Sequence, residues 1–398
     1  MNTNQQKRNQ AIGYFSAFIV LGLSMALIGP SLPRLAENTG TTISQISILF
    51  TASSGGYFVG SVLGGRLYDH YAGHPIMAIV LGIMIVGIAL IPFMPLLWIL
   101  TAILFLLGAL QGILDVGCNT LLIWVYRRDV SPYMNALHFF FGVGTFIAPI
   151  ILAQTALLSG DIKLGYILIA LMIIPVIIWI TRQPTPSAQD QNEEAAEKGP
   201  QNLRQNVILI VFTASILFFY VGAELGFGGW IYTYALESNL ANVTTAAYLT
   251  SAFWGAFSIG RLASIPMATR LRPRSQMFAD FAGIISGMLI IILFSQSQIA
   301  LWAGTMLVGF SMASVFPVTV TLAERRMVVT GQVTSMFFIG VGLGSMLMPW
   351  LIGQLIEPIG PLAAMYVILA AILLDFLVFL GMLRFSSRQS NLTVEQTT

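Results

Sequence analysis

Charge is the scarcest property of this sequence, because only 9% of its 398 residues are charged while 57% are hydrophobic. Such a chain cannot cover a folded domain with a water-compatible surface. The composition therefore excludes a soluble globular protein and indicates one that crosses the lipid bilayer many times. The alternating segments of about ten residues that a membrane β-barrel needs are also missing, so we expect helical spans.

Cysteine and histidine are almost as scarce. The single Cys118 excludes an internal disulfide and a metal site built from several cysteines. The three histidines, His70, His74 and His138, have no spacing typical of a metal or catalytic site. We expect no enzyme activity, no catalytic residue, no metal and no cofactor other than a coupling proton or sodium ion.

About twelve apolar stretches of roughly 18 to 28 residues fill the chain, each long enough to cross the hydrocarbon core. The polar segment 182–204 separates the sixth from the seventh and has no apolar face. We therefore predict an amino-terminal six-helix half (1–181), a linker (182–204) and a carboxy-terminal six-helix half (205–398). The stretches lie near 11–33, 44–68, 76–93, 97–125, 133–158, 164–181, 205–235, 244–269, 276–295, 299–323, 332–356 and 361–384.

The two halves repeat the same motifs in the same order. Phe58, Gly60 and Gly65-Arg66-Leu67 return 195 residues later as Phe253, Gly255 and Gly260-Arg261-Leu262. A second pair, Phe139-Phe140-x-Gly142-Val143-Gly144 and Phe337-Phe338-x-Gly340-Val341-Gly342, is 198 residues apart. Nearly constant offsets predict two parallel repeats, the internal symmetry of a transporter built from two similar halves.

Lysine and arginine lie almost entirely on one side of the predicted spans. If both termini are cytoplasmic, sixteen of the eighteen basic residues face the cytoplasm and only Arg34 and Lys163 lie outside. We expect this orientation, in the inner membrane of a bacterium. The net charge of +2 reflects the same bias and gives no reason to expect nucleic-acid binding.

Several motifs resemble those of the major facilitator superfamily. Gly65-Arg66-Leu67-Tyr68-Asp69-His70, followed by Gly73-His74, resembles its Gly-x-x-x-Asp-Arg-x-Gly-Arg loop. Two others, Asp115-Val-Gly-Cys-Asn119 and His138-Phe-Phe-Phe-Gly-Val-Gly144, look like the fucose:proton symporter group. The segment from Gly222 through Glu224 to Trp230 resembles its sodium-dependent glucose transporter-like branch. The resemblance implies an all-α membrane protein with twelve transmembrane helices in the major facilitator fold.

Charged residues within membrane spans need a partner, a water-filled cavity or a function. Gln111, Asp115 and Asn119 recur every four residues, so they lie along one stripe of their helix. We predict that this stripe binds substrate and that Asp115 also binds the coupling cation. The alternative is a hydrogen-bonded seam between helices.

Glu224 is surrounded by Gly222, Gly226, Gly228 and Gly229, which can let the helix bend or unwind beside a cavity. We predict that Glu224 contributes to cation coupling and substrate binding, with Trp230 beside it. Close helix packing is the alternative role for the glycines.

Three further groups complete the predicted site. His138 is a candidate substrate ligand, or else it pairs with a neighbouring helix. Arg66, Asp69 and Arg261 are candidate gating residues, unless they only set the topology. Two other intramembrane acids, Asp280 and Asp375, are expected to be structural, with Asp280 close to Arg272 and Arg274.

These features predict a secondary transporter of a hexose-like sugar, working by alternating access as a proton or sodium symporter. The partners are a small-molecule sugar and the lipid bilayer, and we expect a monomer. A proton-coupled multidrug or lipid exporter of the same fold is the alternative, and a non-transporting membrane sensor fits less well because both tails are short.

Overall fold

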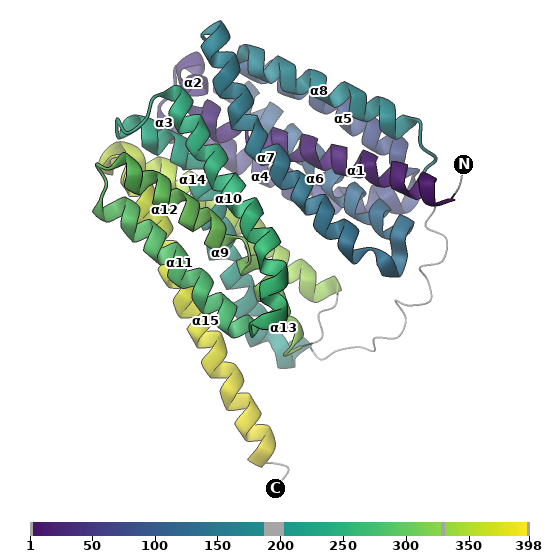
Figure 1. The fold of residues 1–398 in the computed structure, drawn as a ribbon, viewed down its shortest axis with the longest axis vertical. Helices are drawn as coiled ribbons and strands as arrows, with labels where there is room; N and C mark the ends of the chain where they lie inside the picture. Colours follow the sequence, from purple (N-terminus) through teal and green to yellow (C-terminus); the bar gives the residue numbers. More distant parts are fainter. Residues whose placement is uncertain (1–2, 187–202, 328–330, 396–398) are drawn as a thin grey trace.

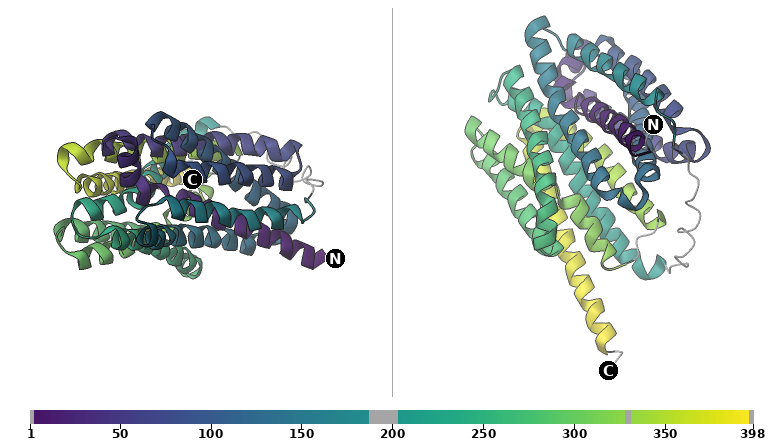
Figure 2. Two further views of the ribbon diagram at one scale, coloured as in Figure 1. Left: turned by 90° about the horizontal axis from the view of Figure 1, so that it is seen from above. Right: turned by 45° about the vertical axis from the view of Figure 1, so that its right-hand side comes forward.

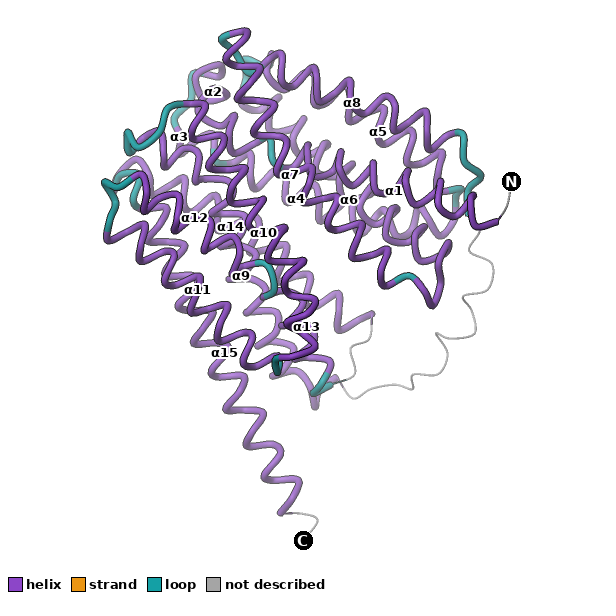
Figure 3. The backbone as a smooth tube through the Cα atoms, viewed as in Figure 1, coloured by secondary structure: helices purple, strands orange, loops and turns teal. Residues whose placement is uncertain are grey.

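The computed structural model describes residues 3–186, 203–327 and 331–395, which form two groups of helices (Figure 1). Helix dominates the described part of the chain, where Figure 3 shows no strand. The first group consists of α1 Thr3–Met25, α2 Ile28–Thr39, α3 Ile43–Ile46, α4 Ile48–His70, α5 Gly73–Leu90, η1 Ile91–Phe93, α6 Leu97–Tyr126, η2 Arg127–Asp129, α7 Ser131–Ser159 and α8 Lys163–Thr181. The second consists of α9 Leu203–Glu237, α10 Val243–Arg270, α11 Pro273–Leu293, α12 Gln298–Met312, α13 Val315–Glu324, α14 Gly331–Ile359 and α15 Ala363–Glu395.

Each of the twelve predicted apolar stretches coincides with one helix or with a pair of consecutive helices. Among the described residues, ten spans are long and apolar enough to cross a membrane, and the pair α1 and α2, bent by 43°, would be an eleventh. The remaining stretch is α10, whose 28 residues include many threonines, serines and glycines. Most of the predicted linker 182–204 lies outside the described residues.

Proline explains two of the interruptions. A proline has no backbone N–H, so it cannot bond to the carbonyl four residues earlier. Pro30 therefore cannot bond to the carbonyl of Ala26, which lies between α1 and α2. In the same way, Pro317 cannot bond to the carbonyl of Ala313, which lies between α12 and α13. The first and tenth predicted spans are therefore each divided into two shorter helices.

The two groups meet at one end and diverge toward the other, where α1 begins and α15 ends (Figure 1). We call these the joined end and the terminus-bearing end. Figure 2 shows the same divergence from a second direction, with α15 projecting beyond its neighbours. Helix pairs α4 with α14, α7 with α10, α3 with α14 and α2 with α9 connect the groups.

Hydrogen bonds across the boundary strengthen the joined end. Ser44 Oγ donates to Gln354 Oε1 (2.7 Å), and Gln354 Nε2 donates back to the Ser44 carbonyl (2.9 Å). Further along α4, Thr51 Oγ1 donates to the Met346 carbonyl (3.0 Å). These bonds run between α3 or α4 and α14, so they join the two halves directly.

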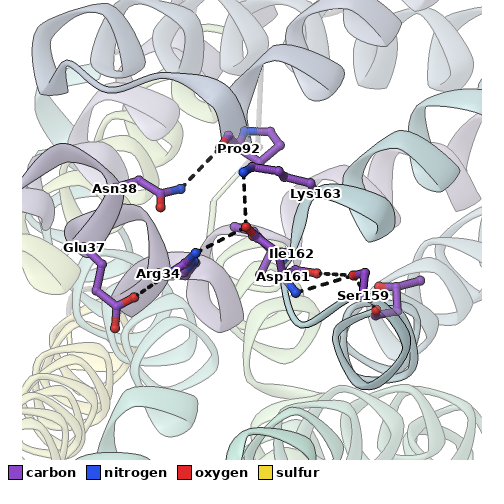
Figure 4. A network of polar contacts seen from close by, with 9 residues as sticks. Arg34, Glu37, Asn38, Pro92, Ser159, Asp161, Ile162 and Lys163 are labelled. Atoms are coloured by element: carbon purple, nitrogen blue, oxygen red, sulfur yellow. Dashed lines mark hydrogen bonds and ion pairs between the residues drawn. The ribbon is translucent and has the colours of Figure 1, made fainter.

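An ion-pair network anchors α2 within the first group (Figure 4). Arg34 bonds to Glu37 (2.7 Å) and to Asp161 (3.2 Å), and Lys163 also reaches Asp161 (3.2 Å). Burial acts to raise the pKa of Asp161, but hydrogen bonds from Arg34 and Lys163 outweigh it and lower that pKa. The two basic residues predicted to lie outside thus share one carboxylate at the joined end.

Glycines hold α4 and α6 in direct backbone contact. A methyl group at Gly60 would come within 1.9 Å of the Ala109 carbonyl oxygen, and one at Gly112 within 2.3 Å of the Tyr57 carbonyl oxygen. Small residues of this kind let membrane helices approach closely. The contact fixes the relative position of Tyr57 on α4 and Asp115 on α6.

Replacement of Gly60 by alanine should therefore destabilise the protein by about 1–3 kcal/mol, because α4 and α6 would have to separate. Gly65→Ala is the matched control, since no atom lies within 4 Å of the added methyl group. The measurement is the thermal unfolding of both purified variants in detergent. Equal midpoints for the two variants would contradict the packing described here.

Candidate functional site

A cavity of about 80 Å³ lies between the two halves. It is lined mainly by apolar side chains, with four hydroxyl groups among them. The lining residues come from both groups of helices: Met25, Ala26, Ile28, Gly29, Phe50, Ser53, Ser54, Phe141, Thr145, Leu225, Gly228, Gly229, Trp254, Ser345 and Pro349. Its position between the halves makes it the candidate substrate site.

Asp115 lies in a cluster of neutral hydrogen-bond donors. The Tyr57 hydroxyl donates to Asp115 Oδ2, and Asn119 Nδ2 donates to Asp115 Oδ1 (2.9 Å). Asn119 also bonds to the Asp115 carbonyl oxygen at 2.9 Å. The i, i+4 spacing on α6 thus brings Asp115 and Asn119 together, and α4 supplies the third member.

Gln111 belongs to the same stripe but points elsewhere. Its side chain is buried, and Nε2 donates to Ser24 Oγ on α1 (2.9 Å). Oε1 has no hydrogen-bond partner among the described residues. Ser24 immediately precedes Met25, which lines the cavity, so Gln111 lies behind the cavity wall.

Glu224 has a cationic neighbour in its own half. Arg261 on α10 is the charged group that acts on its carboxylate, and Tyr220 lies one turn earlier on α9. The Arg261 guanidinium also stacks on Phe257, 4.6 Å from the ring centroid. Two helices of the second half thereby place an acid within electrostatic range of a base.

His138 approaches this pair from the first half. Arg261 is the charged group that acts on it, and its ring makes an edge contact with Phe18 on α1 (5.7 Å between centroids). The side chain is exposed, so it is open to solutes. His138 and Arg261 therefore lie within electrostatic range of each other across the boundary between the halves, where Gly142 on α7 packs on Ser258 of α10.

These polar residues share one level of the molecule. Tyr57 follows the cavity residue Ser53 by four positions, Glu224 precedes Gly228 by four, and His138 precedes Phe141 by three. Residues at such spacings lie on one helix face, about one turn apart. In each helix the step leads toward the terminus-bearing end. We call Tyr57, Asp115, Asn119, His138, Glu224 and Arg261 the central polar layer.

The glycine-rich part of α9 does not unwind, because α9 is a continuous helix from Leu203 to Glu237. Its glycines allow close contacts instead: a methyl group at Gly222 would lie 2.8 Å from Met348, and one at Gly229 would lie 2.8 Å from Phe50. The helix is therefore not unwound at Glu224, and these contacts fit the alternative role of the glycines, close helix packing.

Trp230 lies outside the central polar layer. It is fully buried, its indole Nε1 donates to the Pro349 carbonyl (2.8 Å), and its ring packs against Phe50. Both Pro349 and Phe50 line the cavity. In this conformation Trp230 supports the cavity wall from behind.

The three predicted gating residues are placed differently from one another. Arg66 and Asp69 are exposed at the terminus-bearing end of α4. Arg261 is half-buried with Glu224, although it occupies the same motif position as Arg66. Arg261 thus belongs to the central polar layer in this conformation.

The two acids expected to be structural are both buried. Asp280 accepts a hydrogen bond from Ser314 Oγ (2.7 Å), and no basic residue is among the groups found to act on it in the described chain. Its expected proximity to Arg272 and Arg274 therefore does not produce a pairing. Asp375 on α15 is fully buried, with no hydrogen-bond partner for either carboxylate oxygen among the described residues.

Sequence reasoning missed Tyr57, which donates to Asp115, and Tyr220, which lies one turn from Glu224. A tyrosine in an apolar span carries a hydroxyl that needs a hydrogen-bond partner. This requirement was the feature of the sequence from which their role could have been predicted. Partner identity depends on which helices pack together, and the α4 to α6 contact supplies it for Tyr57.

The chain belongs to the major facilitator superfamily, since the family model matches residues 14–340. It is therefore a membrane transporter, not an enzyme. Within the superfamily it falls in the sodium-dependent glucose transporter-like branch. Sodium-dependent glucose transporter 1 of Danio rerio is 30% identical over 96% of this chain and 70% of its own length, and the Homo sapiens protein is 30% identical over 85% and 72%.

More distant relatives share the same architecture. Major facilitator superfamily domain-containing protein 4A of Mus musculus is 24% identical over 87% of this chain and 86% of its own. A crystal structure of the nucleoside transporter NupG superposes with a TM-score of 0.75 at 14% identity, covering 95% of this chain and 99% of NupG. A crystal structure of tetrameric PepTSo2 superposes with a TM-score of 0.72 at 12% identity, with complete coverage of both chains. These likenesses confirm the predicted fold.

Trp230→Phe should lower stability by about 1–3 kcal/mol, because it leaves the buried Pro349 carbonyl without its donor. Trp98→Phe is a matched control, as Trp98 is 70% exposed. Thermal unfolding of the two purified variants measures the difference. A Trp230→Phe protein as stable as the control would show that the indole hydrogen bond does not contribute to the stability of the protein.

Proposed function

We propose that this protein is a secondary transporter of a hexose-like sugar, driven by symport of a proton or a sodium ion. The observation that carries the proposal is a carboxylate in each half, Asp115 and Glu224, in a polar layer directly beside the cavity between the halves. Relatives over nearly the whole chain are named sodium-dependent glucose transporters, which supports sugar as the substrate class.

The chemistry of the central polar layer fits an uncharged polyol. Asn119, His138 and Glu224 combine amide, imidazole and carboxylate groups, which can donate to and accept from sugar hydroxyls. A site built to hydrogen-bond a hydroxyl also rejects analogues that lack it, because its own polar groups are then left unpaired. Gln111 and Trp230 would act on the substrate through the cavity wall that they support.

Asp115 is the first candidate for the coupling cation. Its partners are uncharged, so a bound proton or sodium ion would not meet a competing positive charge at that carboxylate. Burial makes an ionised carboxylate costly in the empty site, which favours cation binding there. The positive charge of Arg261 already acts on Glu224, so we assign Glu224 mainly to substrate binding, with coupling as a second role.

Alternating access would come from rocking residues 1–181 against 205–398. The halves are hydrogen-bonded at the joined end and diverge at the other, which supports a conformation open toward the terminus-bearing end. The distribution of basic residues supports a cytoplasmic location for that end, in a bacterial inner membrane. In the alternate conformation Arg66, Asp69 and Arg261 would approach the opposite half.

One observation favours a second function, the export of amphipathic drugs or lipids. Phe50, Phe141, Leu225 and Trp254 make much of the cavity lining apolar. An apolar wall also suits the ring faces of a sugar, so the polar layer decides in favour of sugar. Uptake of hexoses and efflux of cationic drugs, compared in the same vesicles, distinguish the two functions.

Asp115→Asn should abolish accumulation of radiolabelled glucose in proteoliposomes under an imposed sodium or proton gradient, because an amide cannot exchange a proton or neutralise a cation. Each gradient is imposed separately, with a no-gradient baseline. Asp375→Asn is the matched control, a buried acid on a different helix. Accumulation by Asp115→Asn at the parent's level would remove Asp115 as the coupling residue.

Glu224→Gln should weaken apparent sugar affinity by about tenfold, or about 1.4 kcal/mol, because the site loses an acceptor and Arg261 loses its counter-charge. Ligand-dependent thermal stabilisation of the purified protein measures this affinity. Glu237→Gln, at the exposed end of the same helix, is the control. Indistinguishable sugar titrations for the two variants would exclude Glu224 from the binding site.

A further inference from the structure

The break between α12 and α13 places polar groups inside the second half. α12 ends at Met312 and α13 begins at Val315, leaving Ala313 and Ser314 between them. Ser314 does not use its side chain to cap α13; its hydroxyl donates to Asp280 on α11 instead (2.7 Å). The facing ends of the two helices carry opposite partial charges, so the net charge at this point is that of Asp280.

Asp280 is only 6% exposed and accepts a single hydrogen bond, from Ser314 Oγ. Within the described chain, no lysine or arginine is found to act on it. A buried carboxylate without a positive partner is expensive, and within a membrane span such a residue indicates an ion or proton pathway. A bound cation would therefore stabilise the negative charge of Asp280.

A second hydroxyl lies one turn away. Ser311 is 7% exposed, and a methyl group at Gly283 would come within 2.1 Å of its Oγ. Gly283 follows Asp280 by three residues on α11, so both present the same helix face. The absence of a side chain at Gly283 thus lets a serine hydroxyl lie against α11, one turn from Asp280 on the same helix face.

We propose that Asp280, Ser311 and Ser314 form a sodium site at the break between α12 and α13. A carboxylate and two hydroxyls supply the oxygen ligands that a sodium ion accepts, and water would complete its shell. Ser314 would turn its hydroxyl proton away from Asp280 when the ion binds. Sodium sites beside interrupted helices are a known solution in transporters. The proposal rests on the cation-coupled function above and adds a cation site separate from Asp115.

The site is connected to the central polar layer by contacts already present. The Tyr220 hydroxyl donates to the Met312 carbonyl at the end of α12 (2.8 Å), and both Glu224 and Asp280 act on Tyr220. On the other side, a methyl group at Gly260 would lie 2.7 Å from Ala313 Cβ, so α10 packs directly on the break. Arg261 is the next residue. A shift of the break on sodium binding would therefore move the neighbours of Glu224.

The test is sodium-dependent thermal stabilisation of the purified full-length protein, with sodium replaced by potassium at constant ionic strength. We expect sodium to stabilise the parent, Asp280→Asn to lose the effect, and Ser314→Ala and Ser311→Ala to weaken apparent sodium affinity by about tenfold. Ser286→Ala, an exposed serine on α11, and Asp375→Asn serve as controls that keep the parent's titration.

No sodium-specific stabilisation of the parent, or a parent-like titration of Asp280→Asn, would overturn the site. So would a stability that responds through Asp280 to pH but not to sodium, because a proton would then be the occupant. If Asp280→Asn folds poorly, the two serine variants decide, and parent-like sodium affinity in both overturns the proposal. Glucose accumulation by the parent is measured separately, so the transport function can fail while the sodium site stands.

Discussion

Direct contact between helix backbones is the constraint on which this structure depends. Moving an apolar side chain from lipid to a protein interior brings little hydrophobic gain, so membrane helices associate through packing and polar contacts. Here glycines provide the packing in matching places of both halves. Gly144 meets Ile19 on α1 and Gly340 meets Ala214 on α9, while Gly112 meets Tyr57 and Gly309 meets Phe253, in each case at a backbone carbonyl oxygen 2.1 to 2.5 Å from an added methyl group.

This packing also determines what the site can contain. With α4 and α6 in backbone contact, Tyr57 and Asp115 have little freedom to separate, so the carboxylate keeps its donor. In the second half, α9 packs on α10, where a methyl group at Gly228 would lie 2.7 Å from Trp254, and this contact holds Arg261 near Glu224. Rigid helix pairs thus carry the polar layer, and the cavity lies where two such pairs from opposite halves face each other.

The helical fold followed from composition and span length, because the bilayer allows few alternatives. Side-chain partners were predictable only where they lie on one helix, as for Asp115 and Asn119. Gln111 lies on the same stripe but points toward Ser24 on α1. Each four-residue step along a helix rotates the side-chain direction by about 40°, so Gln111 points to a different neighbouring helix from Asp115. The role of Trp230 was predicted from its neighbours in the sequence. Its hydrogen-bond partner Pro349 lies 119 residues away, so the sequence did not indicate it.

The duplicated Phe139 and Phe337 motifs show the same limit. Their offset of 198 pairs Gly142 with Gly340, yet Gly142 faces Ser258 of the other half while Gly340 faces Ala214 of its own. Backbone contacts pair Gly144 with Gly340 instead, a register of 196 that agrees with the 195 of the first motif. A short motif aligned by identity can therefore be displaced by two residues from the alignment that packing imposes.

The asymmetry between the halves has a consequence for coupling. Arg66 and Arg261 occupy the same motif position, but only Arg261 lies beside an intramembrane acid. A positive charge near a carboxylate opposes the binding of a further cation there, and Arg261 acts on Glu224 in this way. A carboxylate held by tyrosine and asparagine meets no such competing charge. We therefore expect reversible ion binding at carboxylates whose partners are uncharged. In the described chain, Asp115 and Asp280 meet this condition, whereas Glu224 does not.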